Sequence, residues 1–252
     1  MGLKTDEKLV GKLVTAFTET VVSELQEVQA ITGGTTKNGK NGNSWDVRFN
    51  KIETAALNEG CKALRVQLSA IWSFVAVLVE ETGELFLFFK KANCDNLLKQ
   101  WHHSPYHYLK CFLSKNIHLE AESSDQILLF NAFPDNRYDE KRVKKAKMIL
   151  QNDFDAVKQV VILSLEEYKG VAIDVQARLI TDQGFTSENI SLAAYIASDY
   201  TESGALNNSP AEKPIVRVKQ SVKDEQRKKK KGNPITDLKT NKDKDEEGNS
   251  LV

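Results

Sequence analysis

Hydrophobic residues are densest in the middle of the chain, between residues 63 and 90. Apolar and polar residues alternate strictly over residues 64–69, a pattern that predicts a half-buried strand. Two nearly continuous apolar runs follow, at residues 72–79 and 85–89, and runs of this kind are typical of central strands. Gly83 lies in the polar turn between them and can supply the positive φ that tight hairpin turns require. The centre of the chain therefore predicts adjacent strands that need a covering layer.

A second hairpin is predicted further along the chain, from residues 160–168 and 171–181. In its second strand, apolar positions alternate with Asp174, Gln176 and Arg178. This alternation predicts a sheet with one solvated face.

Helices are predicted where apolar residues recur every three or four positions. They occupy residues 6–30, 45–58, 95–101, 105–113 and 139–151. The expected N-caps are Thr5 or Asp6 for the first of these helices, Ser44 for the second and Asp95 for the third. Two short segments are less distinctive: residues 127–133 predict a strand, and residues 190–196 an edge strand or a helix. Together these elements predict an α+β fold, with a mainly antiparallel sheet and helices packed on one face.

Two segments have no hydrophobic pattern. Residues 33–43 are rich in Gly and Asn and predict a flexible loop. From residue 203 the chain has few aromatic and many charged residues, so it cannot bury enough surface to offset the entropy of ordering. We therefore expect an α+β globular domain over residues 1–202 and a disordered charged tail over residues 203–252.

Composition points to a cytoplasmic protein. The 252 residues are 40% hydrophobic with a formal net charge of zero, and no apolar run reaches the roughly 20 residues of a membrane span. The N-terminal segment is charged and lacks the apolar core of a secretory signal. The three cysteines have no metal-binding spacing, which favours reduced thiols. We therefore expect no membrane association.

A distinctive cluster lies at residues 44–50, Ser-Trp-Asp-Val-Arg-Phe-Asn. In a functional interpretation, Arg48 binds an anion, Asp46 positions it and Trp45 forms a stacking wall. In a structural interpretation, Trp45 packs, while Asp46 caps the helix, where the dipole favours a carboxylate, and pairs with Arg48 or another base. Both interpretations remain open from the sequence.

Three of the four histidines lie in a short aromatic segment, residues 101–108. His103 and His107 are four residues apart, as in a helix-borne metal pair, but Pro105 restricts Ser104 away from helical geometry. The segment instead favours structural histidines or a partner-binding surface that includes His103, His107 and Tyr108.

Motifs for catalysis are weak. A metal-dependent nuclease or hydrolase would need gathered carboxylates and a lysine, for which the candidates are Asp46, Glu53, Glu80, Glu84 and Lys90. Their spacing matches no nuclease pattern, and no Gly-x-Ser-x-Gly nucleophile elbow is present. We therefore predict no catalytic residues, no cofactor and no metal.

Basic residues cluster in two places. The tail holds 12 Lys and Arg against 8 Asp and Glu, so it is basic by four charges while the first 202 residues are acidic by four. Such clusters can bind phosphate backbones through counterion release. The nucleic-acid candidates are Lys141, Arg142 and Lys145 on the predicted helix and Arg227, Lys228, Lys229, Lys230 and Lys231 in the tail.

The chain also resembles an uncharacterised family of bacterial and prophage proteins. The resemblance rests on residues 44–49 (Ser or Thr, Trp, Asp, any residue, Arg, Phe or Tyr), followed by the apolar hairpin at 72–91 and the pair His107-Tyr108. It covers roughly residues 43–196, and the Gly-rich loop and basic tail depart from it. No established activity comes with the resemblance; it implies a bacterial or phage origin.

These observations favour a non-enzymatic cytosolic binding protein. Its partner would be another protein or a complex, as for a bacterial or phage defence or counter-defence factor. The alternatives are nucleic-acid association through the basic tail and the face of the 141–147 helix, and a metal-dependent nuclease or hydrolase. The sequence leaves the oligomeric state open.

Overall fold

The computed structural model describes residues 2–32, 40–70, 72–101, 103–122, 136–168 and 170–197. All of them belong to one unit, Met1–Glu202. The predicted tail, the predicted strand at 127–133 and most of the predicted loop at 33–43 lie outside the described residues.

Six strands form one sheet in chain order. They are β1 (Lys62–Gln67), β2 (Ser73–Val79), β3 (Glu84–Lys90), β4 (Gln159–Tyr168), β5 (Val171–Ile180) and β6 (Thr186–Ser191). Neighbouring strands are antiparallel except β3 and β4, which are parallel. Both predicted hairpins are present, and the turn glycines Gly83 and Gly170 have φ of 74° and 86°. The α+β class and the mainly antiparallel sheet are confirmed.

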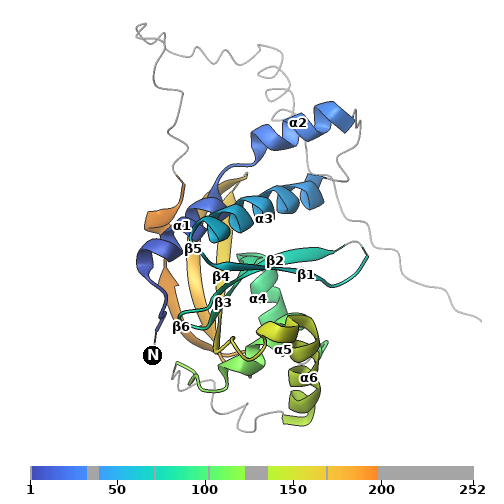
Figure 1. The fold of residues 1–252 in the computed structure, drawn as a ribbon, viewed down its shortest axis with the longest axis vertical. Coiled ribbons are helices and arrows are strands. Elements are labelled where there is room, and N and C mark those ends of the chain that lie inside the picture. The colour runs from blue at the N-terminus through green and yellow to red at the C-terminus, as the bar shows by residue number, and fades with distance from the viewer. Residues whose placement is uncertain are drawn as a thin grey trace, which may run out of the picture. The chain divides into compact units, whose positions relative to one another are not determined.

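Helices cover both faces of this sheet rather than one. They are α1 (Glu7–Thr18), α2 (Val22–Thr32), α3 (Lys40–Asn58), α4 (Lys91–Lys99), α5 (Tyr108–Leu113) and α6 (Asp139–Leu150). Figure 1 shows α1–α3 on one side of the strands and α4–α6 on the other. The parallel pair explains the second layer, because a parallel connection needs a long crossover, and this one carries α4, α5 and α6.

Side-chain contacts confirm the two-sided burial. Phe88 of β3 packs edge-on against Phe17 of α1, with ring centroids 5.2 Å apart. Its neighbour Phe89 points to the opposite face and stacks on Tyr108 of α5 at 6.1 Å. On β5, Arg178 was expected on a solvated face, but it is only 9% exposed and pairs with Asp95 of α4 at 2.6 Å.

The first predicted helix is divided in two. Of the two expected caps, Thr5 and Asp6, the structure has Asp6, which accepts hydrogen bonds from two backbone N–H groups of the first turn. The helix ends at Thr18, whose hydroxyl donates to the carbonyl of Val14 at 2.9 Å and accepts from the amide of Ala197 at 2.9 Å. Glu19 then has extended backbone angles, and α2 starts a few residues later.

Two other predicted caps are wrong. Ser44 lies inside α3, which begins at Lys40. Asp95 lies inside α4, which begins at Lys91 directly after β3. In both cases the helix starts earlier than the apolar periodicity indicated.

The ladder between β2 and β3 is unusually short. Within the described residues it contains three pairs, from Val79–Glu84 to Val77–Phe86. Beyond this point β2 stays paired with β1, and β3 stays paired with β4 as far as Lys90. The two strands therefore diverge and leave a gap in the sheet between residues 73–76 and 87–90.

Candidate functional site

A cavity of about 380 Å³ lies where β2 and β3 diverge. Phe88 and Phe89 both contribute to its wall although they point to opposite faces of the sheet, so the cavity passes through the plane of the strands. The lining is mainly aromatic and amide-bearing: Trp45, Phe49, Trp72, Phe74, Phe88, Phe89, Lys90, Asn93, Asn96, Leu97, Gln100, His107 and Tyr108.

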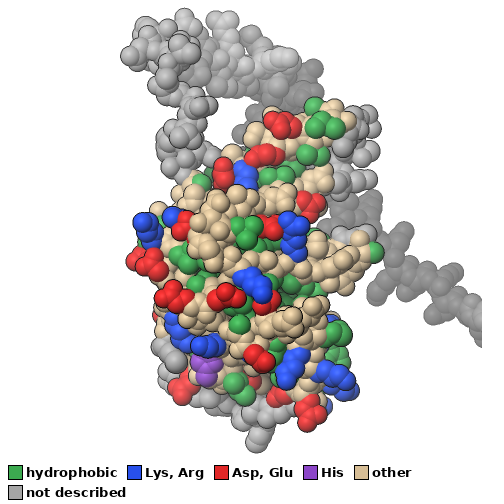
Figure 2. Space-filling model, viewed as in Figure 1, with side chains coloured by type: hydrophobic (Ala, Val, Ile, Leu, Met, Phe, Trp, Pro, Cys, Tyr) green, Lys and Arg blue, Asp and Glu red, His purple; other side chains and the backbone are tan. Residues whose placement is uncertain are grey.

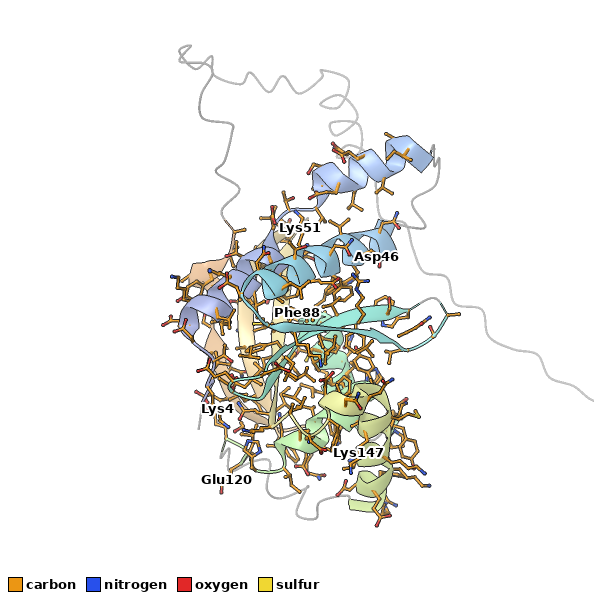
Figure 3. All side chains as sticks on the ribbon, viewed as in Figure 1. Lys4, Asp46, Lys51, Phe88, Glu120 and Lys147 are labelled. Atoms are coloured by element: carbon orange, nitrogen blue, oxygen red, sulfur yellow. The ribbon has the colours of Figure 1, made fainter. Side chains whose placement is uncertain are left out.

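Packed rings fix the apolar walls. On the α3 side, Trp45 lies 5.1 Å from the ring of Phe49 and 6.1 Å from the ring of Phe17. On the α5 side, Tyr108 lies 4.8 Å from the ring of Phe74 and also stacks on Phe89. Figure 3 labels Phe88, a residue of β3, below α3. Rings held by other rings form a pre-organised surface for a flat or apolar group.

Amide side chains form the polar wall. Asn93, Asn96 and Gln100 have the spacing of one helical face, continued from α4 into the following turn, and they are exposed. Among the described residues, no hydrogen bond engages these three side-chain amides. Each amide therefore offers a donor and an acceptor to a group bound in the cavity.

His107 adds a defined donor. It caps α5, and its Nδ1 accepts a hydrogen bond from the amide of Leu109 at 3.3 Å. Burial, assisted by the nearby charges of Lys110 and Lys145, lowers the pKa of His107 to about 4. The ring is therefore neutral at pH 7, and because Nδ1 is an acceptor, its proton lies on Nε2.

Three cations hold the loop that positions His107. Buried Lys110 donates to the carbonyl oxygens of Trp101 and His103. From α6, Arg142 Nε donates to the carbonyl of Pro105 at 3.0 Å, and Lys145 Nζ donates to that of Tyr106 at 2.8 Å. Hydrogen bonds from these charged donors to backbone carbonyl oxygens stabilise a loop that has no regular backbone pairing.

This arrangement changes the interpretation of the basic helix. Arg142 is only 3% exposed, so its prediction as part of a nucleic-acid-binding surface is wrong. Lys145 donates a hydrogen bond to the loop that precedes α5. Lys141 is exposed and lies over the ring of Tyr106 at 5.9 Å. On the face shown in Figure 2, basic and acidic side chains are interspersed. Residues 227–231 lie outside the described residues.

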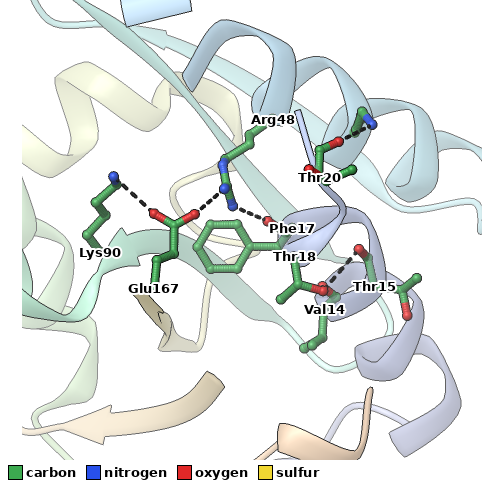
Figure 4. A network of polar contacts seen from close by, with 9 residues as sticks. Val14, Thr15, Phe17, Thr18, Thr20, Arg48, Lys90 and Glu167 are labelled. Atoms are coloured by element: carbon green, nitrogen blue, oxygen red, sulfur yellow. Dashed lines mark hydrogen bonds and ion pairs between the residues drawn. The ribbon is translucent and has the colours of Figure 1, made fainter. Parts of the chain in front are cut away.

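A buried ionic network links the cavity to α1. Arg48 is 3% exposed; one of its NH groups donates to the carbonyl of Phe17 at 2.7 Å and the other pairs with Glu167. The second oxygen of Glu167 lies 3.0 Å from Nζ of Lys90, a cavity-lining residue (Figure 4). Burial lowers the pKa of Arg48, and Glu167 opposes that effect.

The structure separates the predicted cluster around Trp45. Trp45 lines the cavity with His107 and Tyr108, whereas Arg48 lies behind the wall in the network. Asp46 lies exposed on α3 (Figure 3) and does not line the cavity. Of the two pairings expected for it, with Arg48 or with another base, the one with Arg48 is wrong, because Arg48 pairs with Glu167. His103 is also exposed and outside the cavity; only its backbone contributes, by accepting from Lys110.

The nuclease candidates are not gathered. Glu53 pairs with Arg65 at 2.9 Å, and buried Glu84 accepts from the backbone amides of the N-terminal segment. Glu84 and Lys90 lie at opposite ends of β3, roughly 20 Å apart at the usual rise of a strand. Within the described residues, no group of three or more His, Cys, Asp or Glu is placed to hold a metal ion.

Sequence reasoning missed most of the cavity. The apolar pattern places Trp72, Phe74, Phe88 and Phe89 in strands and indicates no binding role for them, because apolar runs in a sheet are usually core. The available signal was the spacing of Asn93, Asn96 and Gln100, an uncharged polar stripe directly after an aromatic strand. The divergence of β2 from β3 has no counterpart in the apolar pattern.

The fold and cavity define an α+β protein with a split six-stranded sheet covered on both faces. The chain belongs to a family of unknown function (DUF5986), which matches residues 3–238. This agrees with the resemblance to an uncharacterised family, but the match is longer than the expected 43–196 and includes the Gly-rich loop and the basic run at 227–231. No curated protein and no solved structure matches the chain. Among the helices described, none is long and apolar enough to cross a membrane.

Proposed function

We propose that this is a non-enzymatic binding protein that receives an apolar or aromatic group of a partner protein in the cavity between β2 and β3. The observation that carries the proposal is the combination of fixed aromatic walls with amides that are not hydrogen-bonded within the described part of the chain. Pockets of this composition bind by apolar contact and use a few polar groups for orientation.

The exposed residues that line the cavity favour a protein partner over a small molecule. Trp72, which is 43% exposed, lines the cavity together with the exposed Asn93 and Asn96. Tryptophan is enriched at the energetic centres of protein interfaces, where a polar rim surrounds a desolvated pocket. Because the chain resembles bacterial and prophage proteins, we also propose that the binding protein acts in defence or counter-defence.

The test is affinity capture from the native host with the full chain, read by quantitative mass spectrometry. Asn96→Arg places a long cation at the cavity mouth from an exposed position, so it should leave the fold intact and reduce recovery of the partner at least tenfold. Asn58→Arg is the matched control, because Asn58 is exposed on α3 and does not line the cavity. Equal recovery with both variants would refute the proposal.

Nucleic-acid association is a second candidate, and the extent of the family match favours it. The match reaches residue 238, so it includes the basic run 227–231 but not the acidic residues Asp243, Asp245, Glu246 and Glu247. A phosphate-binding segment would lose affinity steeply as salt rises. Replacing residues 227–231 by glutamine in the full chain should flatten that salt dependence for single-stranded RNA. Unchanged salt dependence would exclude this candidate.

A further inference from the structure

We infer that the partner enters the cavity as an extended segment whose backbone pairs with the free edge of β3. The inference rests on the proposed function, since it concerns the same cavity. Residues 87–90 of β3 are paired with β4 on one side, and within the described residues no strand pairs with them on the other. At about 3.3 Å per residue this edge is roughly 13 Å long, enough for a segment of four or five residues.

An unpaired strand edge is a template for another strand. Its N–H and C=O groups can form a ladder with an incoming peptide, which is how many domains recognise extended segments. Here the edge is recessed in a gap lined by side chains, and not at the outside of the sheet. Such a position provides backbone hydrogen bonds and side-chain pockets together.

The two faces of the sheet then set the sequence preference. Side chains of a bound strand point alternately to opposite faces. On one face they would meet Trp45, Phe49 and Phe88, which select apolar groups. On the other they would meet Phe89 and Tyr108 beside the amides of α4, which select an apolar or aromatic group with a polar end. The expected segment therefore alternates between these two kinds of residue.

Charge sets the preference at one end. Among the described residues that line the cavity, Lys90 is the one with a formal charge at pH 7, since His107 is neutral. Lys90 shares Glu167 with Arg48, so two cations face a single carboxylate. The local excess of positive charge favours an acidic residue, or a terminal carboxylate, near the end of the segment that lies beside Lys90.

The experiment is selection from a phage-displayed library of linear 12-residue peptides against the full chain. The enriched peptide is then made synthetically and measured by calorimetry, with each backbone nitrogen methylated in turn. We expect alternating apolar and polar-ended residues with an acidic residue at one end. Methylation should weaken binding at least tenfold at every second paired position and less than threefold between them, because alternate N–H groups point toward β3. Enrichment of no peptide, a helical spacing of its anchors, or uniform tolerance of methylation would overturn the inference.

Cavity variants separate this inference from the proposed function. If Asn96→Arg abolishes peptide binding but methylation has no alternating effect, the cavity is the binding site and the strand-pairing inference fails. If methylation alternates but binding is equal for Asn96→Arg and Asn58→Arg, the peptide pairs at another edge and both proposals fail. Trp45→Ala supplies a second test of the wall, provided its unfolding temperature is checked first.

Discussion

The buried pair of Arg48 and Glu167 gives the sharpest prediction about stability. Glu167 is 11% exposed and Arg48 is 3% exposed, so neither charge is well hydrated. Removing one partner of a buried pair typically costs about 3–5 kcal/mol, because the other charge remains buried without compensation. The variant Glu167→Gln keeps the side-chain volume and one acceptor oxygen, which lowers the expected loss to about 2–3 kcal/mol.

The change in melting temperature follows from chain size. For a protein of this length, 1 kcal/mol corresponds to about 2–4 °C, so Glu167→Gln should lower the unfolding temperature by about 4–12 °C. Lys90 contributes little to this loss, because its side chain is 43% exposed and can be hydrated when the carboxylate is removed.

A double-mutant cycle tests the cause. Arg48→Met replaces the guanidinium by an apolar chain, leaves Glu167 paired with Lys90, and should cost about 1–2 kcal/mol through the lost bond to Phe17. The double variant should be about as stable as Arg48→Met alone, since no buried cation then lacks its partner. Urea unfolding of the four proteins at pH 7 measures this. Additive losses, or a loss below about 0.5 kcal/mol for Glu167→Gln, would refute the reasoning.

Three further predictions concern separate sites. In Gly184→Ala the new methyl would lie 2.5 Å from ring carbons of Trp101 in a residue with φ of 87°, so the free energy of unfolding should fall by about 3 kcal/mol. Gly170→Ala, at φ of 86° but in open space, should cost only about 1–2 kcal/mol. Equal losses for the two variants in urea unfolding would contradict this. Because the folded pKa of His107 is lowered to about 4, its neutral form stabilises the fold above pH 6.5 and this contribution is lost as pH falls toward 4. The contribution of His107 to the slope of unfolding free energy against pH should reach at most about 1.4 kcal/mol per pH unit. His107→Asn keeps the cap and should remove this contribution. The same slope in the variant and the wild type would exclude His107 as its origin. Glu84→Gln should speed hydrogen exchange at the two N-terminal backbone amides bound to its carboxylate, at 3.0 and 2.7 Å, and unaltered exchange would show that the contact contributes little.

The sequence predicted the sheet better than its covering layers. Strand positions follow from alternation and apolar runs, and both are local properties of the chain. The second helical layer follows from the parallel pairing of β3 with β4, which is a long-range choice that periodicity does not encode. Arg178 illustrates the consequence: its polar character indicated a solvated face, whereas a carboxylate from α4 allows it to be buried.

The candidate site was predicted only in part. Local composition indicates Trp45, His107 and Tyr108, and the structure brings all three to one cavity. Asp46 and His103 were selected by the same reasoning and lie outside it. Spacing along a helix does not determine which side chains converge across a sheet, because convergence depends on where β2 leaves β3.

The most direct test of the cavity uses the three tryptophans of the chain. Trp45 and Trp72 line the cavity, while Trp101 packs outside it against Gly184. The full chain, labelled with ¹⁵N, is titrated with 4-methylphenol, the side chain of tyrosine without its backbone, and the indole N–H resonances are followed. We predict saturable shifts for Trp45 and Trp72 and a stationary signal for Trp101. Equal, non-saturating shifts of all three resonances, or no shift of any, would contradict it.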